Sequence, residues 1–295
     1  MHTGLLIGTI LTGAILTGAL LVGASVRQTL EDHALARIGN ITHALAGGSR
    51  YFTEDLAKQL AEKDSTLQPI SALILPGMAT RPAGSPEDSP KRLPVTTIGI
   101  HPDFWTLFNQ HTGDIPEIGV QEAIIDERTA ALLGVGPGDD IQLRMVRKSL
   151  MPQDAPLAAT DKKGMLSFLV TVKAVIPDRR GGCFSLLANQ IAAHNIFLNQ
   201  RWMQEQLEWE GRINLLLTAA KETADTLNNA LEKAWRPEQI GLRWRTHESG
   251  IRQLESDRIF LEDPVVAAAS RLHGATPILT YLVNTIAGSE KSTPY

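Results

Sequence analysis

The chain has 295 residues, is 43% hydrophobic and carries a net charge of −4, from 28 Lys and Arg against 32 Asp and Glu. This composition is typical of a globular protein, and the length allows one or two domains of ordinary size. Binding of nucleic acid needs a basic stripe, so the charge balance argues against a nucleic-acid partner. The single cysteine, Cys183, excludes an internal disulfide.

The first predicted element is a transmembrane helix over residues 4–26. No charged side chain and no proline occurs from Thr3 to Val26, and at about 1.5 Å per residue such a run crosses a hydrocarbon core of roughly 30 Å. A signal peptide cleaved near Ala24 is the alternative. The apolar run is longer than in signal peptides, and no Lys or Arg precedes it, so we expect an uncleaved helix that contacts membrane lipid.

Small side chains recur along this helix at intervals of four, as Gly4 and Gly8 and then as Thr9, Gly13 and Thr17. Such spacing lets a second helix approach closely. We therefore expect a packed helix, with a lone anchor as the alternative.

After the span, Leu30 and Ile38 keep helical spacing, which predicts that the helix continues to about Gly39. A second helix, capped by Thr53, follows a glycine pair, and we assign residues 27–64 to a helical stalk. Charged residues on the two sides of the span are few and mixed, so the positive-inside rule does not decide its orientation.

The next stretch predicts strands at residues 69–75 and 95–100. Residues 80–94, with four prolines in fifteen residues, predict an exposed loop without fixed structure between them. A turn and short helix at 101–110 carry three aromatic residues, which we expect to form a small satellite core. These are Phe104, Trp105 and Phe108.

Residues 123–125 predict a short strand, followed by a helix that Asp126 caps and Gly134 ends. A glycine-proline turn leads into a strand at 141–145, and residues 166–178 predict a longer strand. Alternation places four apolar side chains on one face of that strand. They are Phe168, Val170, Val172 and Ala174.

The remaining elements are a short strand at 195–198, a helix that carries Trp202 and a strand–helix–strand pattern over 213–244, which predicts a βαβ unit. The fold class is therefore α+β. We expect two lobes, with residues 119–209 forming a lobe inserted into a second one made of 65–118 and 210–295.

Signatures of catalysis are missing. The nearest approach to a phosphate-binding loop, residues 288–293, lacks the required glycine, and no nucleophile elbow or paired-histidine zinc motif occurs. His247-Glu248 has no second histidine at zinc spacing, Asp139-Asp140 predicts a turn, and Arg179-Arg180 predicts a solvated turn. We predict no catalytic, cofactor-binding or metal-binding residue, no cofactor and no enzymatic activity.

Three segments resemble FtsX-like ABC transporter permeases. Residues 11–52 are similar to the family's first helix and stalk, with its GDSVRxSLxxxAxxRLGxxxxAL pattern. AIIDERTAALLGVGPGDDIQLRM is similar to xVINExLAxxLGVxxGDxIxLR, and FLVTVKAVIPDRRGGCFSLLANQIAAHNIFLN to FTVxAVVPDxGxxxFSLxxxQxxPxNxFV. The resemblance covers most of residues 10–218.

The resemblance implies that residues 65–295 are a MacB-like periplasmic core domain of a permease in the bacterial cytoplasmic membrane. It also implies a separate cytoplasmic ABC ATPase, a second permease subunit, and a role in export, lipoprotein release or mechanotransmission. The family's further spans are absent, so we expect a sequence truncated before the second transmembrane helix. A single-span exoplasmic interaction protein and a signal-anchored enzyme are the alternatives.

Overall fold

The computed structural model describes residues 2–48, 50–82, 90–110, 114–146, 165–187, 193–256, 261, 263–278, 285–287 and 292–294. The chain forms two compact units, Met1–Leu242 and Arg243–Tyr295. The first unit holds the long helix and the main sheet.

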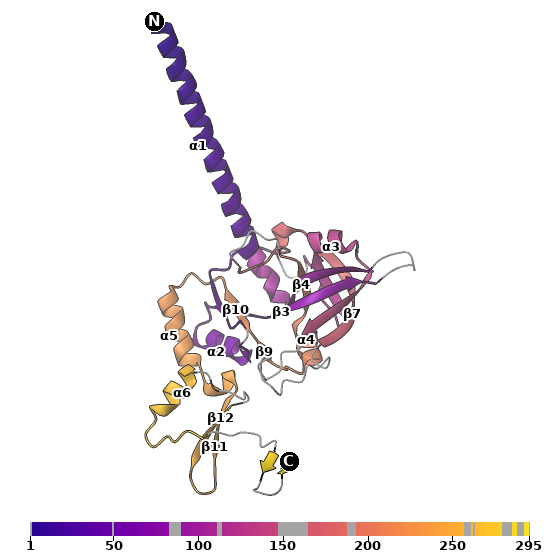
Figure 1. The fold of residues 1–295 in the computed structure, drawn as a ribbon, viewed down its shortest axis with the longest axis vertical. Helices are drawn as coiled ribbons and strands as arrows, with labels where there is room; N and C mark the ends of the chain where they lie inside the picture. Colours follow the sequence, from indigo (N-terminus) through magenta and orange to yellow (C-terminus); the bar gives the residue numbers. More distant parts are fainter. Residues whose placement is uncertain are drawn as a thin grey trace. The chain divides into compact units, whose positions relative to one another are not determined.

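The first element, α1, is one helix from His2 to Ile38 (Figure 1). The predicted continuation of the apolar helix into the stalk is therefore confirmed, and Gly39 ends it with φ at +56°. Within the described residues, Ile10–Ile38 is long and apolar enough to cross a membrane, with a mean hydropathy of 1.7 and no buried part. The full helix measures about 55 Å at 1.5 Å per residue.

The residues after α1 are only partly helical. The predicted stalk over 27–64 is wrong between its two helices, because strands β1 (His43–Ala46) and β2 (Phe52–Thr53) lie there. Helix α2 runs from Asp55 to Lys63, and Glu54 rather than Thr53 precedes its first turn.

The first unit is organised around an eight-stranded sheet in the order β1-β10-β3-β4-β8-β5-β7-β6. Its strands, besides β1, are β3 (Ile70–Arg81), β4 (Lys91–Ile100), β5 (Glu122–Asp126), β6 (Asp140–Val146), β7 (Met165–Ile176), β8 (Asn195–Asn199) and β10 (Leu215–Thr218).

Six of these strands close into a barrel, because β3 also pairs with β6. The pairs β4–β8 and β5–β7 are parallel, and the other pairs around the ring are antiparallel. The closed ring leaves no exposed edge among its own strands, whereas β1 and β10 extend from the first half of β3.

Strand β3 changes partner along its length. Ile70–Ala72 pair with β10, and Gly77–Thr80 pair with β6. Between them the side chain of Asn214 accepts a hydrogen bond from the Ile74 N–H and donates one to the Ile74 carbonyl, both at 2.8 Å. Asn214 thus replaces the missing strand partner. At Gly77 a Cβ would lie 2.9 Å from the Thr97 side chain on β4, so a larger residue would crowd this strand.

The barrel interior is one apolar cluster. Inward side chains from all six strands fill it, and Trp202, Met203 and Leu207 of helix α4 (Gln200–Leu207) join them. Helix α3 (Glu127–Leu133) adds Ala130 and Leu133. The sequence signal for α3 is confirmed, since Asp126 caps it and Gly134 ends it at φ +70°.

Two further clusters lie outside the barrel. The 3-10 helix η1 (Pro102–Phe108) places Phe104, Trp105 and Phe108 in a cluster against β4, β5, β8 and β10, so the predicted aromatic core is confirmed. Helices α2 and α5 (Ala224–Ala234) pack together over β9 (Arg212–Ile213) and β10 (Figure 1). We call α2, α5, β2 and β9 the helical layer.

The expected division into two lobes with separate sheets is wrong. Residues 119–209 supply β5, β6, β7 and β8, but these strands pair directly with β3 and β4 in one sheet. The division failed because these pairings join strands far apart in the sequence, and periodicity reports only local structure.

Three smaller predictions also need correction. The structureless loop expected over 80–94 is shorter, because β3 reaches Arg81 and β4 begins at Lys91. The predicted βαβ unit is absent, since the strand after α5, β11 (Leu242–Thr246), pairs with β12 (Arg252–Ser256). On β7 a register shift opposite Ala123/Ile124 sends Ala174 to the outer aromatic cluster, away from Val172 inside the barrel.

The second unit is smaller. Besides most of β11 and all of β12, it contains helix α6 (Asp263–Ser270), whose described side chains are not buried, and the strand pair β13 (Thr285–Ala287) and β14 (Ser292–Pro294). In the hairpin of β11 and β12, the Arg252 guanidinium lies 4.5 Å from the Trp244 ring centroid.

Candidate functional site

The joint between α1 and the domain is built on Gly39. A Cβ at this position would lie 2.4 Å from the Leu107 carbonyl oxygen and 2.7 Å from the Phe108 ring. The Asn40 N–H donates to the same carbonyl at 2.7 Å, and its side chain donates to Asn109 at 2.6 Å. The end of α1 therefore sits directly on the end of η1. We call this joint, with the loop at Asp178–Phe184, the helix seat.

The loop at Asp178–Phe184 forms the other side of the seat. It begins with the 3-10 turn η3 (Asp178–Arg180), which contacts α1. A Cβ at Gly181 would lie 2.9 Å from the Phe108 ring, and the Ser185 N–H donates to the Arg37 carbonyl at 3.4 Å. Phe108 thus packs against glycines from both sides of the joint.

Arg180 ties this loop to the segment after η1. Its Nε donates to Gln110 Oε1 at 2.7 Å, and its Nη2 donates to the Asp114 carbonyl at 3.0 Å. Arg179 is exposed, as a solvated turn predicts. Arg180 is instead a structural brace, which the sequence did not reveal because its partners lie about 65 to 70 residues away.

The seat is anchored to the barrel by two buried polar residues. Asn195 on β8 donates from its amide to the Gly182 and Phe184 carbonyls, both at 2.8 Å. Its backbone N–H donates to Asp126 at 2.6 Å, and Asp126 also caps α3. Both side chains are fully buried. The loop that contacts the end of α1 is therefore bonded to β5 and β8 through buried side chains.

Cys183 lies in the same loop and is buried. Burial, with the nearby Asp178 carboxylate, raises the pKa of its thiol to about 11. The thiol donates to the Asp178 carbonyl at 3.4 Å. A protonated, buried thiol is a poor nucleophile, so Cys183 has a packing role here.

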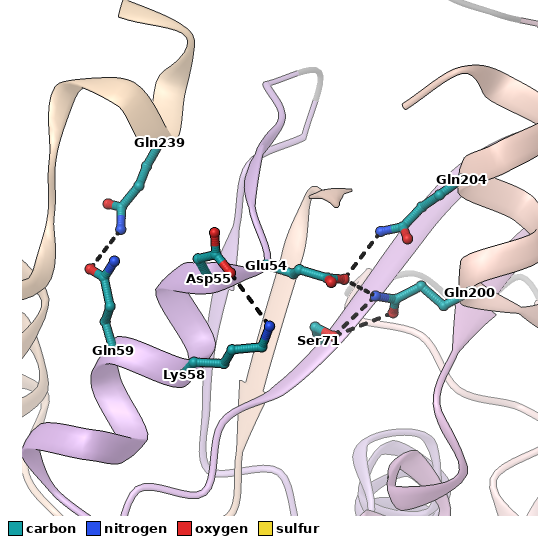
Figure 2. A network of polar contacts seen from close by, with 8 residues as sticks. All are labelled: Glu54, Asp55, Lys58, Gln59, Ser71, Gln200, Gln204 and Gln239. Carbon is teal, nitrogen blue, oxygen red and sulfur yellow. Dashed lines mark hydrogen bonds and ion pairs between the residues drawn. The ribbon is translucent and has the colours of Figure 1, made fainter. Parts of the chain in front are cut away.

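A second polar cluster joins the barrel to the helical layer (Figure 2). The Glu54 carboxylate accepts hydrogen bonds from Gln200 at 3.2 Å and from Gln204 at 3.4 Å. Gln200 and the Ser71 hydroxyl lie 3.1 Å apart, and Gln204 also donates to the Arg212 carbonyl at 3.0 Å. These four contacts connect α4 to the residue that precedes α2, to β3 and to β9. We call Glu54, Ser71, Gln200 and Gln204 the polar clasp.

A pocket of about 230 Å³ lies beside the clasp. Two of its lining residues are joined by a hydrogen bond, which the Gln239 amide donates to Gln59 at 3.0 Å. Figure 2 shows this pair. Charged and polar side chains of both signs line it, so its chemistry favours no single class of ligand. They are Thr53, Asp55, Gln59, Arg236, Glu238 and Gln239.

The acidic and histidine residues singled out in the sequence serve local structure. Asp139 accepts from the Gly136 N–H at 2.8 Å, and Asp140 from the Thr171 hydroxyl at 2.7 Å. His247 lies 2.8 Å from Gln253. Within the described residues no group of three or more His, Cys, Asp or Glu could hold a metal. Residues 288–291 of the loop-like GSEKST segment lie outside the described residues.

No protein-family profile matches the chain, and no curated protein matches it. Several solved structures are similar to it. The periplasmic region of MacB from Actinobacillus actinomycetemcomitans is 11% identical with a TM-score of 0.42, over 81% of this chain and 97% of that one.

Two other solved structures are similar to this chain. The extracellular domain of the ABC-type transporter YknZ from Gram-positive bacteria is 13% identical with a TM-score of 0.41, over 70% of this chain and 90% of that one. A domain of a protein named as a permease, from Porphyromonas gingivalis, is 15% identical with a TM-score of 0.35, over 78% and 86%.

Proposed function

We propose that this chain is the membrane-anchored part of an ABC transporter permease subunit, with α1 crossing the bacterial cytoplasmic membrane and the barrel and helical layer outside it. The observation that carries the proposal is the helix seat. Helix α1 meets the domain without a linker, at a glycine enclosed by Leu107 and Phe108. Such a joint transmits movement of the helix, whereas a flexible tether would absorb it.

The segments that resemble FtsX-like permeases support this role by where they lie. The stretch at 123–145 forms β5, α3 and β6, and the stretch at 168–199 forms most of β7, the loop of the seat and β8. The second stretch therefore includes the loop of the helix seat, and the first includes Asp126, which bonds to Asn195 behind that loop. Within these two stretches, the Asn195 backbone N–H donates to Asp126, and the Asn195 amide donates to the Gly182 and Phe184 carbonyls.

The length of α1 and the contacts at its end explain how movement would pass from the cytoplasmic side to the barrel. A hydrocarbon core of roughly 30 Å takes about 20 helical residues, and the stalk at 27–38 adds about 18 Å at 1.5 Å per residue. A shift of the cytoplasmic end is carried along this single helix to the seat. From there the buried bonds of Asn195 and Asp126 carry it into the barrel.

The proposed partners supply what this chain lacks. ATP hydrolysis needs a phosphate-cradling loop with its lysine, so we assign hydrolysis to a separate cytoplasmic ATPase and no enzymatic activity to this chain. No atom lies within 4 Å of a Cβ placed on Gly8 or Gly13 of α1. That space suits close packing against another span, in a second permease subunit or elsewhere in the complex. Export, lipoprotein release or mechanotransmission is the proposed output.

Site-specific cross-linking in native membranes tests the proposal. A photo-reactive residue at position 2 should cross-link to a cytoplasmic ATPase that carries a phosphate-binding loop, and the yield should change between ATP-bound and nucleotide-free membranes. The same residue at exposed Glu208, in the first unit, is the matched control and should not reach that ATPase. Equal cross-linking from both positions, or ATP turnover by this purified chain alone, contradicts the proposal.

A further inference from the structure

Helix α4 has two faces with different partners. Its apolar face places Trp202, Met203 and Leu207 in the barrel interior. It lies close to β4, since a Cβ at Gly99 would be 3.0 Å from the Met203 sulfur. Its other face carries Gln200, fully buried, and Gln204, 4% exposed. Helix α4 therefore plugs the barrel with one face and turns a polar, buried face outward, while Arg201 and Glu205 between these faces are exposed.

The helical layer meets that outer face through polar groups. The apolar cluster of the barrel and the apolar cluster under α2 and α5 are separate. Between them lies the polar clasp, with Glu54 at the start of α2 facing both glutamines (Figure 2). Tyr51 and Trp209, with ring centroids 4.4 Å apart, pack against the barrel cluster. Parts joined by polar contacts separate at lower cost than parts that share an apolar core.

We propose that Glu54 is a latch that fixes the helical layer to the barrel plug, and that losing its bonds to Gln200 and Gln204 lets the two parts open against each other. Both bonds end on the same carboxylate oxygen. One half-buried side chain thus accepts hydrogen bonds from two buried amides. The inference concerns the fold alone and holds whether or not the chain serves an ABC transporter.

Charge gives the latch its strength. A carboxylate accepts hydrogen bonds about twice as strongly as a neutral oxygen. Without Glu54, Gln200 keeps the Ser71 hydroxyl and Gln204 keeps the Arg212 carbonyl as acceptor, but one N–H of each buried amide loses its partner, which is costly. Glutamine at position 54 keeps the shape and one acceptor oxygen but loses the charge. The two variants Glu54→Gln and Glu54→Ala therefore weaken the latch in two steps without adding bulk.

Hydrogen–deuterium exchange on the full chain in detergent measures the opening. We expect exchange in α4 and at β2 and β9 to be about tenfold faster or more in Glu54→Ala, and faster by a smaller factor in Glu54→Gln. Exchange in β5 and β7, on the other side of the barrel, should stay at the wild-type rate. The matched control is Glu205→Gln on α4, whose side chain is 49% exposed and pairs with Arg201; it should change nothing.

Two results would overturn the proposal. Wild-type exchange in α4 of both Glu54 variants would mean that apolar packing alone holds the plug. Equal acceleration in α4 and in β5 and β7 would mean that Glu54 supports the whole fold and is no latch. Should Glu54→Ala fail to fold, Glu54→Gln decides by the same two criteria.

Discussion

At the residue scale, Gly39 combines two requirements that only glycine meets. Its φ of +56° is strained for other residues, and the Leu107 carbonyl occupies the space of a side chain at 2.4 Å. We expect Gly39→Ala to lower the free energy of unfolding by about 2–4 kcal/mol, from backbone strain plus overpacking. Thermal or denaturant unfolding of the detergent-solubilised chain measures it.

Gly48 offers a matched control for this prediction. It has nearly the same backbone, with φ at +59°, but no atom within 4 Å of a Cβ. Gly48→Ala should therefore lower the free energy of unfolding by about 1–2 kcal/mol, from backbone strain alone. Equal losses in the two variants would show that the contact with Leu107 and Phe108 contributes nothing.

Cys183 gives a prediction in pH. Because burial raises the pKa of its thiol to about 11 from an ordinary value near 9, the folded state holds the proton more tightly than the unfolded state. Its contribution to stability is complete below pH 9 and is lost as the pH rises from about 9 to 11. At pH 8 we expect alkylation of the native protein to be about a hundredfold slower than in denaturant. Comparable rates would contradict the buried, protonated thiol.

At the element scale, β3 depends on the side chain of Asn214. This side chain occupies the gap where β3 leaves β10 and has not yet joined β6, and it is 6% exposed. Asn214→Ala leaves the Ile74 N–H and carbonyl without their partner, which should cost about 2–4 kcal/mol. Asn228→Ala, on the exposed face of α5, should cost less than about 0.5 kcal/mol in the same unfolding assay. A cost for Asn214→Ala as small as that of the control would refute the role.

Local signals explain which elements could be predicted. The uninterrupted apolar run predicts α1, and the pair Asp126 and Gly134 marks both ends of α3. The pairing of β3 with β6 and of β4 with β8 could not be predicted, because no period in the sequence encodes which distant strand lies next. The register shift on β7 moves Ala174 to another cluster for the same reason, since it is defined by the pairing with β5.

In the candidate site, too, only the features with a local sequence signal could be predicted. The glycine at the end of α1 was visible as a helix end, but its enclosure by η1 required residues about 70 positions away. Glu54 carried no signal of its function, because Gln200 and Gln204 are ordinary helix formers whose burial depends on the closed barrel.

At the scale of the whole molecule, the proposed coupling depends on close packing around α1. Gly13→Leu adds a bulky side chain where the chain itself leaves open space, so the domain should remain folded. ATP-dependent transport by the full permease should fall by roughly tenfold, because a second helix can no longer approach closely. Transport assays in membrane vesicles, with circular dichroism as the folding check, measure both effects.

Ala14→Leu is the matched control, since it adds bulk to a helix face about 100° away. It should transport at nearly the wild-type rate. Equal transport by Gly13→Leu and wild type would remove the packing argument for α1.

The place of β1 in the sheet governs how this protein matures. Within the described residues, β1 at His43–Ala46 pairs only with β10 at Leu215–Thr218, so its partner is synthesised about 170 residues later. At about 5–20 residues per second, a ribosome needs roughly 10–30 s to reach it. During that interval α1 is already complete and can enter a bilayer, while the following chain cannot yet close its barrel, because β8 also comes late. Under the proposed topology, the order of strands thus leaves the following chain unfolded, and able to cross the membrane, while α1 inserts into the bilayer.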